Sequence, residues 1–116
     1  IYMEHFNQYK DIKNAIDNHE IILLFGKSNR CTVCDAVLPK IQQMVKKHSI
    51  YSAIIAIEDY PEFSGQFSVF TAPTVLLFAL GKEVFRQSRF ILFEELEKRL
   101  SSGELCMQRG RFVFDQ

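Results

Sequence analysis

This sequence has no excess of charge of either sign. Fourteen Lys and Arg residues balance fourteen Asp and Glu residues along 116 positions, and neither sign gathers into a block. Proteins that bind a phosphate backbone or an anionic membrane usually present such a block. We therefore expect neither nucleic acid nor a membrane among the partners of this protein.

Long apolar runs and a framework of several cysteine pairs are also missing. The longest apolar run, 72–80, contains a proline and is far shorter than the roughly 20 residues that span a bilayer. The chain has three cysteines, and only two of them are close in sequence, which is unlike the disulfide framework of a secreted domain. We expect a soluble monomer in the reducing cytoplasm; removal of an export signal is the alternative.

The length and the apolar content predict one domain over residues 1–116. A chain of 116 residues has a common domain size, and 47% of its residues are of apolar types, with Phe alone occurring eleven times. Burial of this surface can stabilise a fold without a structural metal or a disulfide. The cysteines are thus available for chemistry.

The spacing of the apolar residues predicts an α/β fold. In chain order, the expected elements are a helix over about 4–18, a buried strand over 21–25, a helix that Cys31 caps and that runs to about 48, a buried strand over 52–57, a short helix within 61–67, a hairpin of strands 74–79 and 83–88, and a helix around 93–100. The first two strands are joined through a helix and should be parallel. We predict a central mixed sheet of about four strands flanked by helices, with a C-terminal extension over 102–116.

Cys31 and Cys34 form a C-x-x-C motif at the start of a predicted helix. A helix N-terminus favours negative charge through its unpaired N–H groups and its dipole, and a cysteine reacts as its thiolate. Cys31 is therefore expected to attack a substrate disulfide, and Cys34, one turn further on, to resolve the mixed disulfide. The positive charge of Arg30 would further favour the thiolate.

A C-x-x-C pair can also be half of a zinc site. The other candidate ligands are Cys106, His5, His19 and His48. They supply no second pair at a recognised spacing. We therefore predict no metal, and no cofactor beyond a redox-active disulfide between the two motif cysteines. No role is assigned to Cys106.

The order of these features closely resembles the thioredoxin superfamily over about residues 20–101. A strand, a C-x-x-C motif at a helix start, a second strand, an Ala-Pro-Thr turn and a hairpin follow one another. Pro39 within the helix, and Gly81 eight residues after Pro73, fit the same pattern. The resemblance implies that Pro73 follows a cis peptide bond and packs against the cysteine pair, and that the backbone of Ala72 pairs with an extended substrate.

The chain also departs from thioredoxin proper. It contains no tryptophan: the usual Trp before the first cysteine is Arg30 here, and the usual Gly-Pro between the cysteines is Thr32 and Val33. We expect these three positions to tune the stability of the thiolate. The buried carboxylate that the family keeps beneath its cysteines falls on Phe25, and a glycine of the substrate groove falls on Arg89. The latter change predicts a different choice of partner.

These features predict a thiol–disulfide oxidoreductase that exchanges a Cys31/Cys34 dithiol for a disulfide. Its substrates would be disulfide-containing proteins or small thiols, and a reductase or an oxidant would recycle it; the direction of electron flow is left open. The alternative is a catalytically degenerate protein of the same fold that works as a protein-binding module. The Phe residues at 63, 67 and 70 are expected in the core rather than at the site. The alternative is that Phe residues near the loops form an exposed apolar surface around the thiols that binds peptides.

Overall fold

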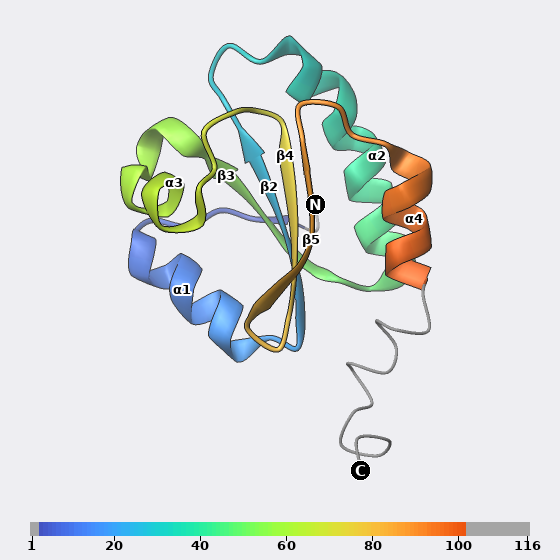
Figure 1. Cartoon of the computed structure of the whole chain (residues 1–116), viewed down its shortest axis with the longest axis horizontal. Helices are drawn as coiled ribbons and strands as arrows, with labels where there is room; N and C mark the ends of the chain where they lie inside the picture. The colour runs from blue at the N-terminus through green and yellow to red at the C-terminus, as the bar shows by residue number, and fades with distance from the viewer. Residues whose placement is uncertain (1–2, 102–116) are drawn as a thin grey trace.

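The computed structural model describes residues 3–101, so the predicted extension over 102–116 and Cys106 lie outside the described residues. A central sheet carries helices on both faces (Figure 1). Its strands are β1 (Met3–Glu4), β3 (Tyr51–Ala56), β2 (Ile21–Lys27), β4 (Thr74–Ala79) and β5 (Lys82–Ser88), in that spatial order. The predicted α/β class and mixed sheet are confirmed. The predicted number of about four strands is one too few.

The additional strand, β1, also explains why the first helix was predicted too long. Met3 pairs with Ser52 of β3 in a parallel register, and α1 extends over Tyr9–Asn18 rather than 4–18. Phe6 lies in the connection between these two elements. It packs against buried residues, and its carbonyl oxygen accepts a hydrogen bond from the Tyr60 hydroxyl. Phe6 therefore follows the helical spacing without being helical, and a two-residue strand is too short to show an alternating pattern.

β2 forms the centre of the sheet and leads directly to the cysteine pair. It pairs with β3 in a parallel register and with β4 in an antiparallel one, and its first six residues are buried. A strand between two neighbours, covered on both faces, needs apolar residues at every position. This confirms the buried strand predicted from the run at 21–25, which continues two residues further, to Lys27.

β4 and β5 form the predicted hairpin. The connection consists of Leu80 and Gly81, with φ of 53° and 83°. Two central residues with positive φ give the tight turn whose twist matches that of the flanking strands. The hairpin places the start of β4 and the end of β5 at the same end of the sheet, since Thr74 pairs with Ser88.

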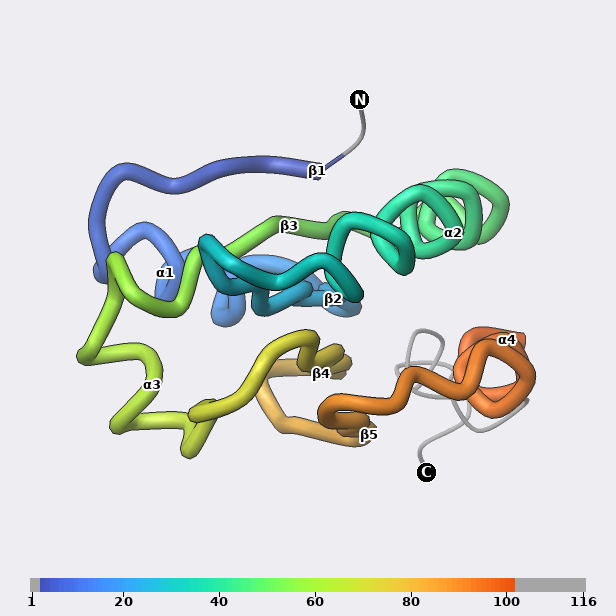
Figure 2. Tube along the Cα trace, turned by 90° about the horizontal axis from the view of Figure 1, so that it is seen from above, coloured from blue at the N-terminus to red at the C-terminus, as the bar shows by residue number. Residues whose placement is uncertain are grey.

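The helices cover the two faces of the sheet in pairs. α1 and α3 (Pro61–Phe67) lie on one side, and α2 (Thr32–His48) and α4 (Phe93–Ser101) on the other (Figure 2). Each pair supplies a separate core cluster. Ile12 and Phe63 belong to the first, whereas Cys34, Ile41 and Leu96 belong to the second. The second cysteine of the motif is thus part of the packed core beneath α2.

The C-terminal end of α2 is tied to α4 by a small polar cluster. Oε2 of Glu97 lies 2.8 Å from Nε2 of His48 and 3.1 Å from Nζ of Lys47. The hydroxyl of Ser101 donates to the same oxygen at 3.1 Å. The contact with His48, followed by that with Lys47, lowers the pKa of the Glu97 carboxyl from its usual value of 4.5, because both favour the charged form.

We expect Glu97→Gln to lower the free energy of unfolding near neutral pH, by less than about 1 kcal/mol because the cluster is accessible to solvent. A carboxyl whose folded pKa is depressed stabilises the fold above its unfolded pKa, and this contribution is lost as the pH falls through the folded pKa. The difference between wild type and variant should therefore shrink below pH 4.5. Urea unfolding at about pH 7 and about pH 3 measures it, with Glu94→Gln on the same helix as the control. A difference that stays constant over this range would contradict the assignment.

Candidate functional site

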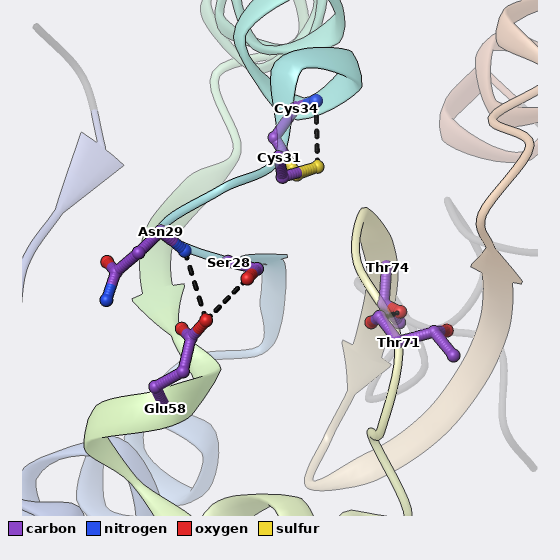
Figure 3. The surroundings of a disulfide bond; sticks show 7 residues. All are labelled: Ser28, Asn29, Cys31, Cys34, Glu58, Thr71 and Thr74. Atoms are coloured by element: carbon purple, nitrogen blue, oxygen red, sulfur yellow. Dashed lines mark hydrogen bonds between the residues drawn. A yellow bond between two sulfur atoms is a disulfide. The ribbon is translucent and has the colours of Figure 1, made fainter.

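The two motif cysteines lie where β2 passes into α2. They form a disulfide, with the Cα atoms of Cys31 and Cys34 5.2 Å apart, inside the ordinary range for such bonds (Figure 3). Cys31 is half-buried, whereas only 2% of the Cys34 surface is exposed. One sulfur of the pair can therefore be reached from solvent, and the other is sheltered in the core.

Cys31 is the N-cap of α2, as its position in the sequence predicted. Its backbone is extended, with φ −106° and ψ 94°, and its Sγ accepts a hydrogen bond from the backbone N–H of Cys34 at 3.0 Å. Asp35 donates its N–H to the carbonyl of Cys31 at 3.4 Å. The helix itself continues through Pro39. One N–H group of the first turn, that of Cys34, is thus directed at the sulfur on which negative charge would develop.

The loop before β4 faces the cysteine pair from across the site (Figure 3). The peptide bond between Ala72 and Pro73 is cis, and Pro73 is buried. The hydroxyl of Thr74 donates to the carbonyl of Thr71 at 2.6 Å, and the N–H of Arg89 donates to the carbonyl of Pro73 at 2.7 Å. Both bonds hold the loop in place beside Cys31.

Arg89 occupies a backbone conformation that favours glycine. Its φ is 72°, in the left-handed region, and its residue surface is exposed at the end of β5. The resemblance places a glycine of the family's groove at this position. Here an arginine adopts the left-handed backbone conformation, and its N–H binds the carbonyl of Pro73.

An open hollow of about 370 Å³ lies in front of the disulfide. We call it the Cys31 hollow; its lining residues are Ser28, Arg30, Cys31, Thr32, Val33, Ile57, Phe70 and Ala72. Arg30 and Thr32 are exposed, as is Val33, at 52%. The structure thus brings Cys31 and four other predicted site residues, Arg30, Thr32, Val33 and Ala72, around one space. Pro73, the next residue after Ala72 in the sequence, is buried and is not part of the lining.

The predicted core position of Phe70 is wrong, and the alternative of an exposed Phe beside the cysteines holds for this residue. Phe63 is 1% exposed and Phe67 is partly buried, but Phe70 is 71% exposed and lines the Cys31 hollow. The chain leaves α3 at Ser68, and Val69 takes the buried position that follows. Nothing in the local spacing separates Phe70 from its buried neighbours, because which residue after α3 faces the core depends on how this segment packs against the rest of the fold.

A carboxylate that the sequence did not single out supports the loop leading to Cys31. Glu58, in the short 3-10 helix η1 (Ile57–Asp59), accepts hydrogen bonds from the hydroxyl of Ser28 and, at 3.1 Å, from the N–H of Asn29 (Figure 3). The Ser28 hydrogen bond, followed by that of Asn29, lowers the pKa of Glu58. The partners are 30 and 29 residues away along the chain, so no local pattern could reveal them.

The core beneath the cysteine pair contains Phe25 where the family has a carboxylate. Phe25 is fully buried, pairs with Ile54 of β3 and with Val75 of β4, and shares a core cluster with Cys34. Phe25 thus leaves no carboxylate at this position of the core.

Two other kinds of feature are absent from the described residues. Among residues 3–101, no group of three or more His, Cys, Asp or Glu side chains is placed to hold a metal ion. No helix in the same part of the chain is long and apolar enough to cross a membrane.

The sequence comparisons establish the family. No protein-family model matches the chain. The chain is, however, 40% identical over 90 residues to thioredoxin-like protein YdfQ of Bacillus subtilis, an alignment that covers 77% of this chain and 80% of YdfQ. The chain belongs to the thioredoxin-like proteins. It is also 28% identical over 76 residues to thioredoxin-2 of Pyricularia oryzae, which covers 65% of this chain and 44% of that protein.

Solved thioredoxin structures share the fold. A thioredoxin mutant from Halobacterium salinarum superimposes with a TM-score of 0.75 at 16% identity, over 83% of this chain and 85% of that one. Thioredoxin 1 of Thermosipho africanus gives a TM-score of 0.63 at 27% identity, over 82% and 99%. A thioredoxin fold with a C-x-x-C pair at disulfide distance is the general arrangement of a thiol–disulfide oxidoreductase.

Proposed function

We propose that this protein exchanges the Cys31/Cys34 dithiol for a disulfide in polypeptide or small-thiol substrates. The observation that carries the proposal is the unequal exposure of two bonded sulfurs at a helix start: Cys31 opens onto a hollow, and Cys34 is buried behind it. A metal ligand pair would need both sulfurs directed at one ion. A nucleophile with a sheltered resolving thiol needs this asymmetry.

In the reductive direction the exchange has two balanced steps. The thiolate of Cys31 attacks one sulfur of a substrate disulfide, so that a Cys31–substrate bond forms and the second substrate sulfur leaves as a thiolate. Cys34 then attacks the Cys31 sulfur, which closes the 31–34 disulfide and releases the first substrate sulfur. Two electrons pass to the substrate. The oxidative direction is the reverse of these steps.

The N-terminal turn of α2 favours the reactive form of Cys31. The Cys34 N–H that lies 3.0 Å from the Cys31 sulfur in the disulfide form is placed to stabilise a thiolate once the disulfide opens. Since the position of the family's acid is occupied by Phe25, no carboxylate at that position takes the proton of Cys34. We propose that this proton passes to water or to the departing substrate thiolate.

The loop at Ala72 and Pro73 is proposed to bind the substrate backbone. Ala72 precedes the first paired residue of β4, Thr74, so it lies outside the strand ladder while lining the Cys31 hollow. An extended substrate segment could pair with its backbone as a short added strand. A separate reductase or oxidant would recycle the cysteine pair between substrates.

An equilibrium redox titration tests the proposal. The Cys106→Ser chain, whose remaining cysteines are 31 and 34, is equilibrated in graded dithiol–disulfide buffers, and free thiols are trapped and located by mass spectrometry. We expect Cys31 and Cys34 to be oxidised and reduced together, as one two-electron couple. The midpoint then decides whether the protein works as a reductant or an oxidant. A pair that never closes would refute the catalytic function and favour the binding module.

A further inference from the structure

The Cys31 hollow is electrically one-sided. Among the described residues that line it, Arg30 is the only charged one; the others are small polar or apolar residues and the cysteine. The lining comes from three segments, 28–33, 57 and 70–72. The acidic residues nearest to them along the chain are Asp35 in the first turn of α2 and Glu58 in η1, and neither lines the hollow. Glu58 is also engaged by Ser28 and Asn29.

Arg30 is free to bind a ligand. Lys47, His48 and Arg86 are held in ion pairs with Glu97 or Glu83, whereas Arg30 is exposed and, within residues 3–101, has no ion-pair partner. It stands directly before Cys31, so a group bound to it lies next to the reacting sulfur. An exposed guanidinium without a partner is a strong donor for a carboxylate.

Half of the residues that line the hollow are apolar and come from all three segments. They are Val33, at 52% exposure, Phe70, at 71%, and the less exposed Ile57 and Ala72; Phe70 and Ala72 belong to the loop before β4, away from Arg30 in the chain. Large apolar side chains held in solvent beside a reactive thiol mark a surface that is covered when a partner binds. An apolar side chain next to the substrate cysteine would cover these residues.

We propose that this site selects polypeptide disulfides in which an acidic residue flanks the cysteine on the Arg30 side and an apolar residue flanks it on the Phe70 side. The inference rests on the proposed exchange reaction and adds its substrate class. The carboxylate pairs with the Arg30 guanidinium while Cys31 attacks the neighbouring sulfur. Arg30 thus determines substrate specificity, in addition to the tuning of the Cys31 thiolate that its charge predicts.

Single-turnover rates of peptide disulfides test the proposal. Three peptides carry Glu, Gln or Lys before a cysteine and Leu after it, each as a mixed disulfide with the same small thiol. The second-order rate constant for reduction of each peptide by the reduced Cys106→Ser chain is measured. It is divided by the rate constant for reduction of the same peptide by a small dithiol, which removes intrinsic differences in reactivity between the peptides. The Glu/Gln ratio of these values does not respond to a change in Cys31 reactivity, since such a change affects both peptides alike.

We expect Arg30→Gln to lower the Glu/Gln ratio about threefold, and Arg30→Glu to lower it about tenfold, because an exposed pair is weak and its reversal repels. Lys82→Gln is the matched control: it removes one positive charge at the far end of β5 and should leave the ratio unchanged. The preference should fade in about 1 M salt. Phe70→Ala should slow all three peptides about threefold without changing the ratio.

Each of the other outcomes refutes one part of the proposal or the exchange function on which it rests. A Glu/Gln ratio that is equal in wild type and Arg30→Glu refutes the acidic preference, while reduction of all three peptides by the wild type still upholds the exchange function. Reduction of none of them refutes the exchange function itself. Glutathione disulfide serves as a small substrate that carries carboxylates. If it is reduced as fast as the Glu peptide, and if Arg30→Gln slows both reactions by the same factor, any small carboxylate suffices and the polypeptide assignment is refuted. Unchanged rates in Phe70→Ala would refute the apolar half.

Discussion

Replacing Cys31 with serine should lower the rate of disulfide reduction by at least about a thousandfold. A hydroxyl at this position is a far weaker nucleophile than a thiolate, and Cys34, only 2% exposed, cannot reach a substrate in its place. Cys34→Ser should behave differently. It keeps the exposed nucleophile but lacks the resolving thiol, so a mixed disulfide between Cys31 and the substrate should accumulate in stoichiometric amount and be detectable by mass spectrometry.

The two variants control each other, because each removes one sulfur from the same turn of α2. Neither variant can form the 31–34 disulfide. Both are therefore compared with the fully reduced wild type, so that differences in rate do not reflect the presence of the disulfide. Full activity in Cys31→Ser would contradict the assignment of the nucleophile. A mixed disulfide that forms on Cys34 in Cys31→Ser, but not on Cys31 in Cys34→Ser, would reverse the two roles. Binding of a partner by the double variant would instead favour the binding module.

The Phe25→Ala substitution should lower the free energy of unfolding by about 3–5 kcal/mol. Phe25 is fully buried in the central strand, between Ile54 and Val75, and removal of its ring leaves a cavity in the cluster that also contains Cys34. A loss of this size is a large part of the roughly 5–15 kcal/mol that stabilises a typical domain. Urea unfolding of the reduced Cys106→Ser chain and of its Phe25→Ala variant measures the difference.

Phe70→Ala is the matched control for this measurement. It deletes the same atoms from a ring that is 71% exposed, and should change the unfolding free energy by no more than about 0.5 kcal/mol. Similar losses for the two variants would contradict the placement of Phe70 on the surface. A loss of less than about 1 kcal/mol for Phe25→Ala would contradict its burial beneath the site.

Much of the fold follows from patterns within single elements. The uninterrupted apolar run before Gly26 predicted the central strand, and the cysteine at the start of the apolar stripe predicted the cap of α2. The helix of this stripe, the hairpin and the fold class follow in the same way. Each of these depends on periodicity and backbone preference among consecutive residues, which the sequence contains in full.

The errors occur where distant segments meet. β1 has two residues and exists because β3 offers an edge for it, which no local pattern shows. Phe6 packs against the core from a loop, so the helix that its spacing predicted begins only at Tyr9. Phe70 resembles its buried neighbours in the sequence but lies on the surface, since Val69 takes the inward position after α3 ends.

The candidate site divides along the same line. The proposed chemistry is local. Two sulfurs one helical turn apart, the helix start and the arginine before it lie within a few consecutive residues, and their proposed roles follow from spacing and charge. What surrounds the reactive sulfur is not local. The Pro73 loop, the Phe70 ring and the link from Glu58 to Ser28 come from separate segments. Their meeting depends on the order of strands in the sheet and on which side chains can share the core, which no single stretch of sequence encodes.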